Sequence, residues 1–318
     1  MTEVIDIVLP VFGLIGIGYV IAWSRLLDEN TGQGLVDFVF GVAIPVLIFR
    51  IIVIADFSAA GPWRLWLPFF LGFTAAWIAG HQMARRLFGR DARGGLVAGV
   101  AAAYGNTVLI GVPLSIAAYG DAGAVAIALI VAVHLPVMMA ASAVLIGQAE
   151  RLDGAGKGEP DRWEVARSLG RNLAANPIII GIVAGALWRL MGLPLAGVPA
   201  VLVSRIADVA ATLALLALGL SLRRYGIARN IPAGLALSVL KLVAMPALVL
   251  VLARYVVAMP PVWAKVAVIA AACPSGVNVY LVAIRFRTGE ALASNAILIS
   301  TGLGVLSTAF WLRAVEWL

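Results

Sequence analysis

The sequence predicts an all-α integral membrane protein with ten transmembrane helices. Of its 318 residues, 63% are hydrophobic and only 12% are charged, and its mean hydropathy is +1.03. A soluble chain carries about 25% charged residues, so the composition excludes an ordinary soluble enzyme and a disordered chain. Apolar segments of about 20 residues, long enough to cross a bilayer as helices, recur along the whole sequence. Alternating ten-residue strands are absent, and unpaired backbone groups are costly in lipid, so these segments are expected to be helices.

The expected spans alternate with short polar connections. They lie near residues 4–24, 32–53, 63–84, 93–119, 122–147, 176–192, 200–222, 232–257, 262–284 and 292–315.

The net charge of +7 describes topology rather than a nucleic-acid partner. Of the 23 Lys and Arg residues, 15 fall in one alternating set of connections, seven fall in the other, and Lys241 lies inside a span. Basic residues collect on the cytoplasmic side of a membrane protein. We therefore expect a multi-pass protein of the cell inner membrane, with both termini extracytoplasmic and the lipid bilayer as a partner.

One long polar connection, residues 148–175, divides the chain into halves of five spans each. Residues 1–147 form the first half and residues 176–318 the second, and residues 163–171 are expected to form a short interfacial helix. An odd number of spans in each half gives two repeats of opposite orientation. The alternative is that the even division is a coincidence.

The fourth span of each half carries the strongest local signal. Both spans contain Gly, Pro and Asn within one short stretch, 104–113 in the first and 273–280 in the second. Gly and Pro interrupt the helical hydrogen-bond ladder, and the free N–H groups of a half-helix near the membrane midplane can bind an anion. The predicted binding residues are Asn106, Thr107, Gly111, Pro113, Pro274, Ser275, Gly276, Val277 and Asn278. A single such segment could be a simple proline kink, but two at matched positions favour a site.

Three ionisable residues lie inside the predicted spans. Lys241 is about nine residues from the nearest span end, where an amine costs about 2.5–3.5 kcal/mol and is expected to face protein or a wet cavity. It could attract an anion, pair with a carboxylate or change protonation during transport, or its amine could reach the interface. Asp37 and Asp208 are shallower. They could be proton or cation sites, or they could cap a helix or pair with a base such as Arg205.

Neither a metal site nor an enzyme motif is predicted. Cys273 is the single cysteine, and neither His81 nor His134 has a partner at metal-ligand spacing. Phosphate-binding loops, nucleophile elbows, zinc-protease and dinucleotide motifs are all absent. We expect no cofactor and no catalytic activity.

These residues resemble the auxin efflux carrier family, which includes the plant PIN-formed carriers and bacterial carriers of malonate or malate. The resemblance covers nearly the whole chain outside the central connection. The fourth and ninth spans, with 106–114 and 274–277, match the family's crossover motifs, and Pro45 lies in a segment similar to its second helix. Residues 206–220 are similar to its seventh helix, and Lys241 with Pro246 follows the pattern of its eighth.

The resemblance implies a five-plus-five inverted repeat like that of bile acid symporters and NhaA-type antiporters. Helices one, two, six and seven would form a scaffold that makes a homodimer. Helices three to five and eight to ten would form a transport domain, with helices four and nine crossing at their breaks. The resemblance also implies elevator-type transport of a small organic anion such as indole acetate, malonate or malate. Asn106 and Pro45 would lie at the substrate.

Two other functions stay open at this stage. One is a sodium- or proton-coupled symporter or antiporter that uses Asp37 or Asp208. The other is a membrane sensor or channel, in which the crossed helices would bind a ligand without stoichiometric transport. The coupling ion, the substrate and the net direction of transport do not follow from the residues.

Overall fold

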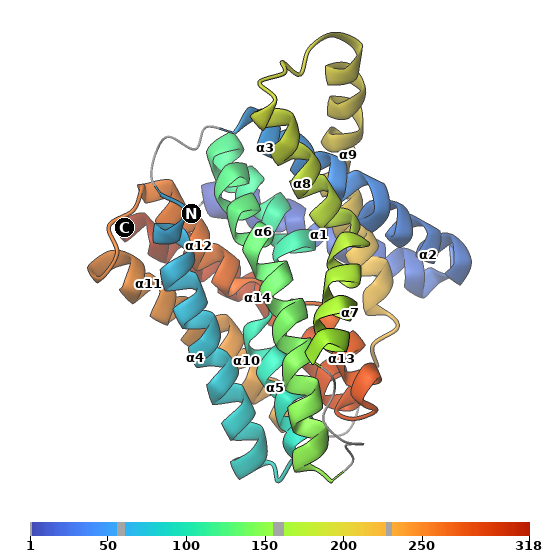
Figure 1. Ribbon diagram of the computed structural model, residues 1–318, viewed down its shortest axis with the longest axis vertical. Helices are drawn as coiled ribbons and strands as arrows, with labels where there is room; N and C mark the ends of the chain where they lie inside the picture. The colour runs from blue at the N-terminus through green and yellow to red at the C-terminus, as the bar shows by residue number, and fades with distance from the viewer. Residues whose placement is uncertain (1, 56–60, 155–161, 227–230) are drawn as a thin grey trace.

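The computed structural model describes residues 2–55, 61–154, 162–226 and 231–318. All regular structure within these residues is helical, apart from one isolated β-bridge. Residues 155–161 of the expected central connection lie outside the described residues. The helices cross at steep angles and both termini lie on the same side of the view in Figure 1.

The helices of the first half and of the central connection follow in chain order. They are α1 (Thr2–Ser24), α2 (Glu29–Phe38), η1 (Val39–Ala43), α3 (Ile44–Ile54), α4 (Trp63–Leu87), α5 (Ala92–Ala103), η2 (Thr107–Gly111), α6 (Val112–Leu152) and α7 (Arg162–Ala174). The helix expected at 163–171 is confirmed as part of α7, and its place at the membrane interface stays a prediction.

The second half begins at Pro177. Its helices are α8 (Pro177–Leu190), α9 (Gly197–Leu222), α10 (Ile231–Val239), η3 (Leu240–Ala244), α11 (Met245–Tyr255), α12 (Pro261–Ala272), α13 (Asn278–Phe286), α14 (Glu290–Ala314) and η4 (Val315–Trp317).

Six helical stretches of the described chain are long and apolar enough to cross a bilayer, and a seventh is added if the bent pair α7 and α8 counts as one span. This count is smaller than the ten expected spans: α4, at the expected span 63–84, is not among the six, and breaks in the helices account for others. The expected spans 93–119 and 262–284 are each broken into shorter helices. Spans four and five are also joined in α6, which turns without ending at Gly120, where φ is 57° and ψ is −141°.

Proline positions account for two local changes of helical pitch. The π-helical turns η1 and η3 lie directly before Pro45 and Pro246, which are the second residues of α3 and α11. Because proline has no N–H and its ring displaces the carbonyl four residues earlier, the preceding turn widens. Each of these two prolines therefore follows a π-helical turn.

The helices pack in two groups. α1 packs against α9 and α3 against α8, whereas α4 packs against α5 and α11 against α12. Gly18 of α1 and Gly219 of α9 meet where these helices cross, and a Cβ on Gly219 would lie 2.8 Å from the backbone nitrogen of Tyr19. Small residues let helix backbones approach closely in a membrane protein.

Candidate functional site

Two broken helices meet near the middle of the chain's second group of helices. The first break, Tyr104–Asn106, separates α5 from η2, and the second, Cys273–Val277, separates α12 from α13. Gly105 and Ser275 form an antiparallel β-bridge. The N–H of Asn106 donates to the oxygen of Pro274 at 2.7 Å, and that of Gly276 donates to the oxygen of Tyr104 at 2.9 Å. Each break therefore satisfies backbone groups that the other has freed, as burial in a membrane requires.

Glycines at the crossing allow this close approach. A Cβ on Gly276 would lie 2.8 Å from the Tyr104 ring, and one on Gly105 would lie 3.1 Å from the Lys241 amine. Both distances are shorter than ordinary carbon contacts, so a larger residue at either position would displace the Tyr104 ring or the Lys241 amine.

Polar side chains complete the hydrogen bonding of the breaks. Asn106 caps η2, because its Oδ1 accepts from the N–H of Leu109 at 3.2 Å. The Ser275 hydroxyl donates to the oxygen of Ala101 at 2.7 Å, and the Ser275 N–H donates to the Ser300 hydroxyl at 2.9 Å. Asn106 and Ser275 are both buried, so both stabilise the crossing itself in this conformation.

Lys241 lies beneath the crossing and is fully buried. Its amine donates to the oxygen of Ala271, in the last turn of α12, and lies 3.6 Å from the Met245 sulfur. The C-terminal end of a helix carries partial negative charge, which a cation stabilises. Lys241 thus places positive charge next to the end of a half-helix, and it lines neither of the two cavities described below.

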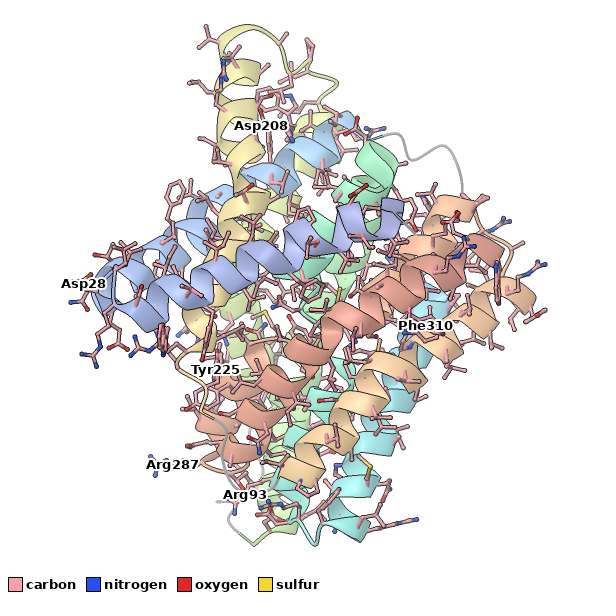
Figure 2. The ribbon with its side chains drawn as sticks, turned by 180° about the vertical axis from the view of Figure 1, so that it is seen from behind. Asp28, Arg93, Asp208, Tyr225, Arg287 and Phe310 are labelled. Carbon is pink, nitrogen blue, oxygen red and sulfur yellow. The ribbon has the colours of Figure 1, made fainter. Side chains whose placement is uncertain are left out.

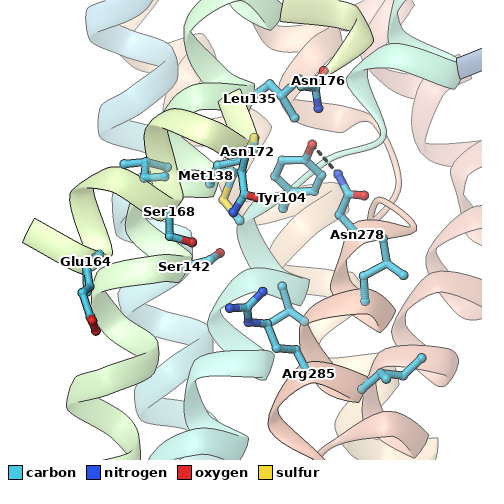
Figure 3. A pocket seen from close by; sticks show the side chains of 16 residues that line it. Tyr104, Leu135, Met138, Ser142, Glu164, Ser168, Asn172, Asn176, Asn278 and Arg285 are labelled. Atoms are coloured by element: carbon cyan, nitrogen blue, oxygen red, sulfur yellow. Dashed lines mark hydrogen bonds between the residues drawn. The ribbon is translucent and has the colours of Figure 1, made fainter. Parts of the chain in front are cut away.

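Tyr104 and Asn278 form the end of the crossing that faces a cavity. The Asn278 amide donates to the Tyr104 hydroxyl at 2.8 Å, as Figure 3 shows. Both residues line a cavity of about 680 Å³. Its other walls come from α6, α7, Asn176 and α13, with the residues Leu135, Met138, Met139, Ser142, Glu164, Val165, Ser168, Leu169, Asn172, Leu281, Val282, Ile284 and Arg285. We call this space the crossing cavity.

A second cavity of about 280 Å³ reaches the same asparagine from the side of α2 and α9. Asn278 and Val277 line it together with Gln33, Phe40 and Arg224, among others. Asn278 is therefore exposed to cavities on two sides of the α13 start.

The other predicted binding residues of the first break follow it directly. Thr107, Gly111 and Pro113 lie in η2 and the start of α6 and are buried. The Thr107 hydroxyl lies 3.4 Å from Nδ1 of His134, and Gly111 faces the Cys273 sulfur. With the residues of the second break and Lys241, the structure gathers most of the predicted set around one crossing.

Three predicted residues lie elsewhere. Pro45 packs against Gly181 of α8. Asp37 accepts a hydrogen bond of 2.5 Å from Gln33, and Asp208 forms an ion pair with Arg50 at 2.6 Å. The base beside Asp208 is thus Arg50 of α3 rather than the sequence neighbour Arg205.

Sequence reasoning gave no binding role to Tyr104, Ser300 or Arg285. Tyr104 lies within the break motif, and Ser300 is a polar residue in an apolar span, so both carried a local signal. Arg285 is one of the 15 basic residues in the richer set of connections, and nothing in the sequence shows that it lines the cavity. Within the part of the chain that the structure describes, no three His, Cys, Asp or Glu side chains are grouped to hold a metal ion.

Comparison with known proteins identifies the family of the chain. The family described as "Membrane transport protein", which comprises the auxin efflux carriers, matches residues 3–312. The chain belongs to this family. It is 31% identical over 327 residues to a Rhizobium meliloti protein named "Putative malonate transporter", covering 96% of this chain and 93% of that protein. It is 26% identical over 309 residues to an "Uncharacterized transporter" of Methanothermobacter thermautotrophicus, covering 96% of both chains. The protein is thus a multi-pass membrane transporter.

Proposed function

We propose that the protein is a secondary carrier of small organic carboxylates. The observation that carries this proposal is a hydrogen-bonded helix crossing that opens, at Tyr104 and Asn278, into a cavity of about 680 Å³. α13 begins at Asn278 and no side chain caps its first turn. The N–H groups of Val279 and Tyr280 already donate to the oxygens of Gly276 and Val277 at 3.1 Å, so the attraction for a carboxylate comes from the partial positive charge of the helix start and from the Asn278 side chain.

The crossing itself contributes neutral donors to the substrate site. The Tyr104 hydroxyl accepts from Asn278, so its own proton is free to be donated to an anion. Neutral donors bind an anion without holding it too tightly for release, which a carrier needs. Lys241 adds positive charge from behind the crossing.

The architecture that fits this function is a five-plus-five inverted repeat of ten spans, with residues 1–147 and 176–318 as the repeats and 148–175 as the cytoplasmic connection. The packing supports it. In such a repeat α1 corresponds to α8 and α3 to α9, so the contact of α1 with α9 has its counterpart in the contact of α8 with α3. In the same way α4 corresponds to α11 and α5 to α12, and the contact of α4 with α5 has its counterpart in that of α11 with α12. Spans one, two, six and seven would form a dimerising scaffold, and the remaining six would move as an elevator.

The substrate class follows from the site and from the relatives together. A site of helix-end donors suits a carboxylate, and a relative at 31% identity is named for malonate. Malonate, malate and indole acetate are the candidates. Asp37 and Asp208 line neither cavity, so the geometry favours a carboxylate carrier over an ion antiporter that uses these acids.

Counterflow in proteoliposomes tests the proposal. Vesicles loaded with unlabelled malonate, malate or indole acetate should take up the labelled compound, and Asn278→Ala should reduce the rate by about tenfold or more through the loss of an anion donor. Asn30→Ala is the matched control, because Asn30 is exposed on α2 and lines neither cavity. Binding without counterflow would identify a sensor instead of a carrier, and an Asn278→Ala protein with normal rates would remove the crossing as the site.

A further inference from the structure

One face of α13 lines the crossing cavity over its full length. Asn278, Leu281, Val282 and Arg285 all contribute to the wall. Their spacing of three, four and seven residues places them on a single helix face. The polar groups lie at the two ends of this face, and apolar side chains lie between them.

Arg285 is a cation available to a ligand in this cavity. The charged residues that line the crossing cavity are Arg285 and Glu164, and Glu164 belongs to α7 on the opposite wall. Among the described residues, Arg285 has neither a salt bridge nor a hydrogen-bonded partner. Figure 3 shows its guanidinium directed into the space between α6 and α13. A guanidinium offers five N–H donors in a planar fork that matches a carboxylate.

The separation of the two polar ends suits a short molecule. Seven residues of α-helix span about 10.5 Å between Cα atoms. Helical side chains lean toward the N-terminus of their own helix, so the long Arg285 side chain covers much of that distance toward Asn278. A three- or four-carbon diacid carries its two carboxylates only a short distance apart, as two donor groups on one helix face require.

We propose that Arg285 binds the second carboxylate of a short dicarboxylate whose first carboxylate lies at Tyr104 and Asn278. This inference rests on the carrier function proposed above and narrows its substrate class. Leu281 and Val282, between the two ends, contact the carbon atoms that join the carboxylates. The arginine thereby selects a dianion over a monocarboxylate of the same length.

Malonate and propionate distinguish a preference for dicarboxylates from one for monocarboxylates, because both have three carbons and they differ by one carboxylate. Counterflow in proteoliposomes is measured for both compounds with the wild type, Arg285→Gln, Arg285→Lys and Arg171→Gln. Arg171 is exposed on α7 and does not line the cavity, so its substitution removes the same charge from a nearby surface.

Arg285→Gln should raise the half-saturating malonate concentration by about tenfold or more, as expected for the loss of a charge-assisted hydrogen bond. It should leave propionate unchanged, Arg285→Lys should be intermediate, and Arg171→Gln should match the wild type. The role of Arg285 would be overturned if Arg285→Gln raised the half-saturating concentrations of malonate and propionate equally. It would also be overturned if Arg171→Gln raised that of malonate as much as Arg285→Gln does. Wild-type transport of propionate without malonate would also overturn it and would leave the carrier function standing. The absence of counterflow for every carboxylate would overturn the carrier function itself.

Discussion

Lys241 combines full burial with a hydrogen bond to a backbone oxygen. Its amine donates a hydrogen bond to the Ala271 oxygen at the end of α12 and lies close to Gly105 in the opposite break. The cost of burying an amine is offset here by the partial negative charge of a helix end. The sequence identified Lys241 as an outlier, but it could not show that the amine faces a half-helix end.

Lys241→Met should lower the free energy of unfolding by about 1–3 kcal/mol, because the buried Ala271 oxygen loses its donor. Lys265→Met is the matched control. Lys265 pairs with Glu316 at 3.1 Å near the protein surface, where an ion pair contributes about 0–1 kcal/mol. Thermal unfolding in detergent compares the two variants. Equal melting temperatures would show that Lys241 does not stabilise the crossing.

Asp153 joins the end of α6 to the start of α5. Its carboxylate accepts hydrogen bonds from the N–H groups of Ala92 at 2.8 Å and Arg93 at 3.0 Å, and from the Arg93 side chain at 2.9 Å. Burial alone favours the neutral acid, but these donors together lower the pKa of Asp153 below its ordinary value of 3.8. A lowered pKa stabilises the fold above the unfolded pKa, and this contribution is lost as the pH falls through the folded value.

Asp153→Ala should therefore lower the melting temperature at pH 6, by an amount equivalent to about 0.5–2 kcal/mol for a lost helix cap. The difference from the wild type should shrink as the pH falls below about 4, where the wild-type carboxylate becomes protonated. Asp121→Ala, at an exposed site on α6, should show no such pH-dependent difference. A constant difference across this range would mean that the charge of Asp153 does not stabilise α5.

Helix breaks could be located from sequence because Gly and Pro act locally. The stretches 104–113 and 273–280 were identified by residue type alone, and both are broken in the structure. What could not be predicted is how each break is satisfied, because this depends on contacts between distant segments. The bond of Ser275 to Ser300 and that of Asn278 to Tyr104 both join segments that are far apart in the sequence.

The contact of α1 with α9 depends on two glycines, and it is sensitive to one methyl group. Gly219→Ala should destabilise the protein by about 1–3 kcal/mol, because the added Cβ meets the backbone of α1 at Tyr19. Gly13→Ala is the control, since a Cβ there meets nothing within 4 Å and alanine favours a helix. Thermal unfolding with size-exclusion chromatography measures both variants. If Gly219→Ala is as stable as Gly13→Ala, the close approach of α1 and α9 is not required.

The two-sided charge pattern of the sequence has a counterpart in the whole molecule. Figure 2 shows Asp28, Tyr225, Arg287 and Arg93 along one edge, with Asp208 and Phe310 away from it. The first four residues border connections that the positive-inside rule places in the cytoplasm. Hydropathy predicted more crossings than the described residues show as unbroken spans, in part because α5 and α12, which begin the two broken spans, are each too short to cross a bilayer. The side of each connection stays a prediction.

Opposite orientation of the halves can be tested by cysteine labelling, because Cys273 is the single cysteine and is buried. Leu26 and Leu193 follow the first and sixth expected spans, so they are equivalent positions in the two repeats, and both are exposed. If the repeats are inverted, equivalent positions lie on opposite sides of the membrane. A membrane-impermeant maleimide should label Leu193→Cys in intact cells and Leu26→Cys only after permeabilisation, whereas the wild type should stay unlabelled. Labelling of both variants from the same side would contradict the inverted repeat, and a complete reversal would keep the repeat but place the termini in the cytoplasm.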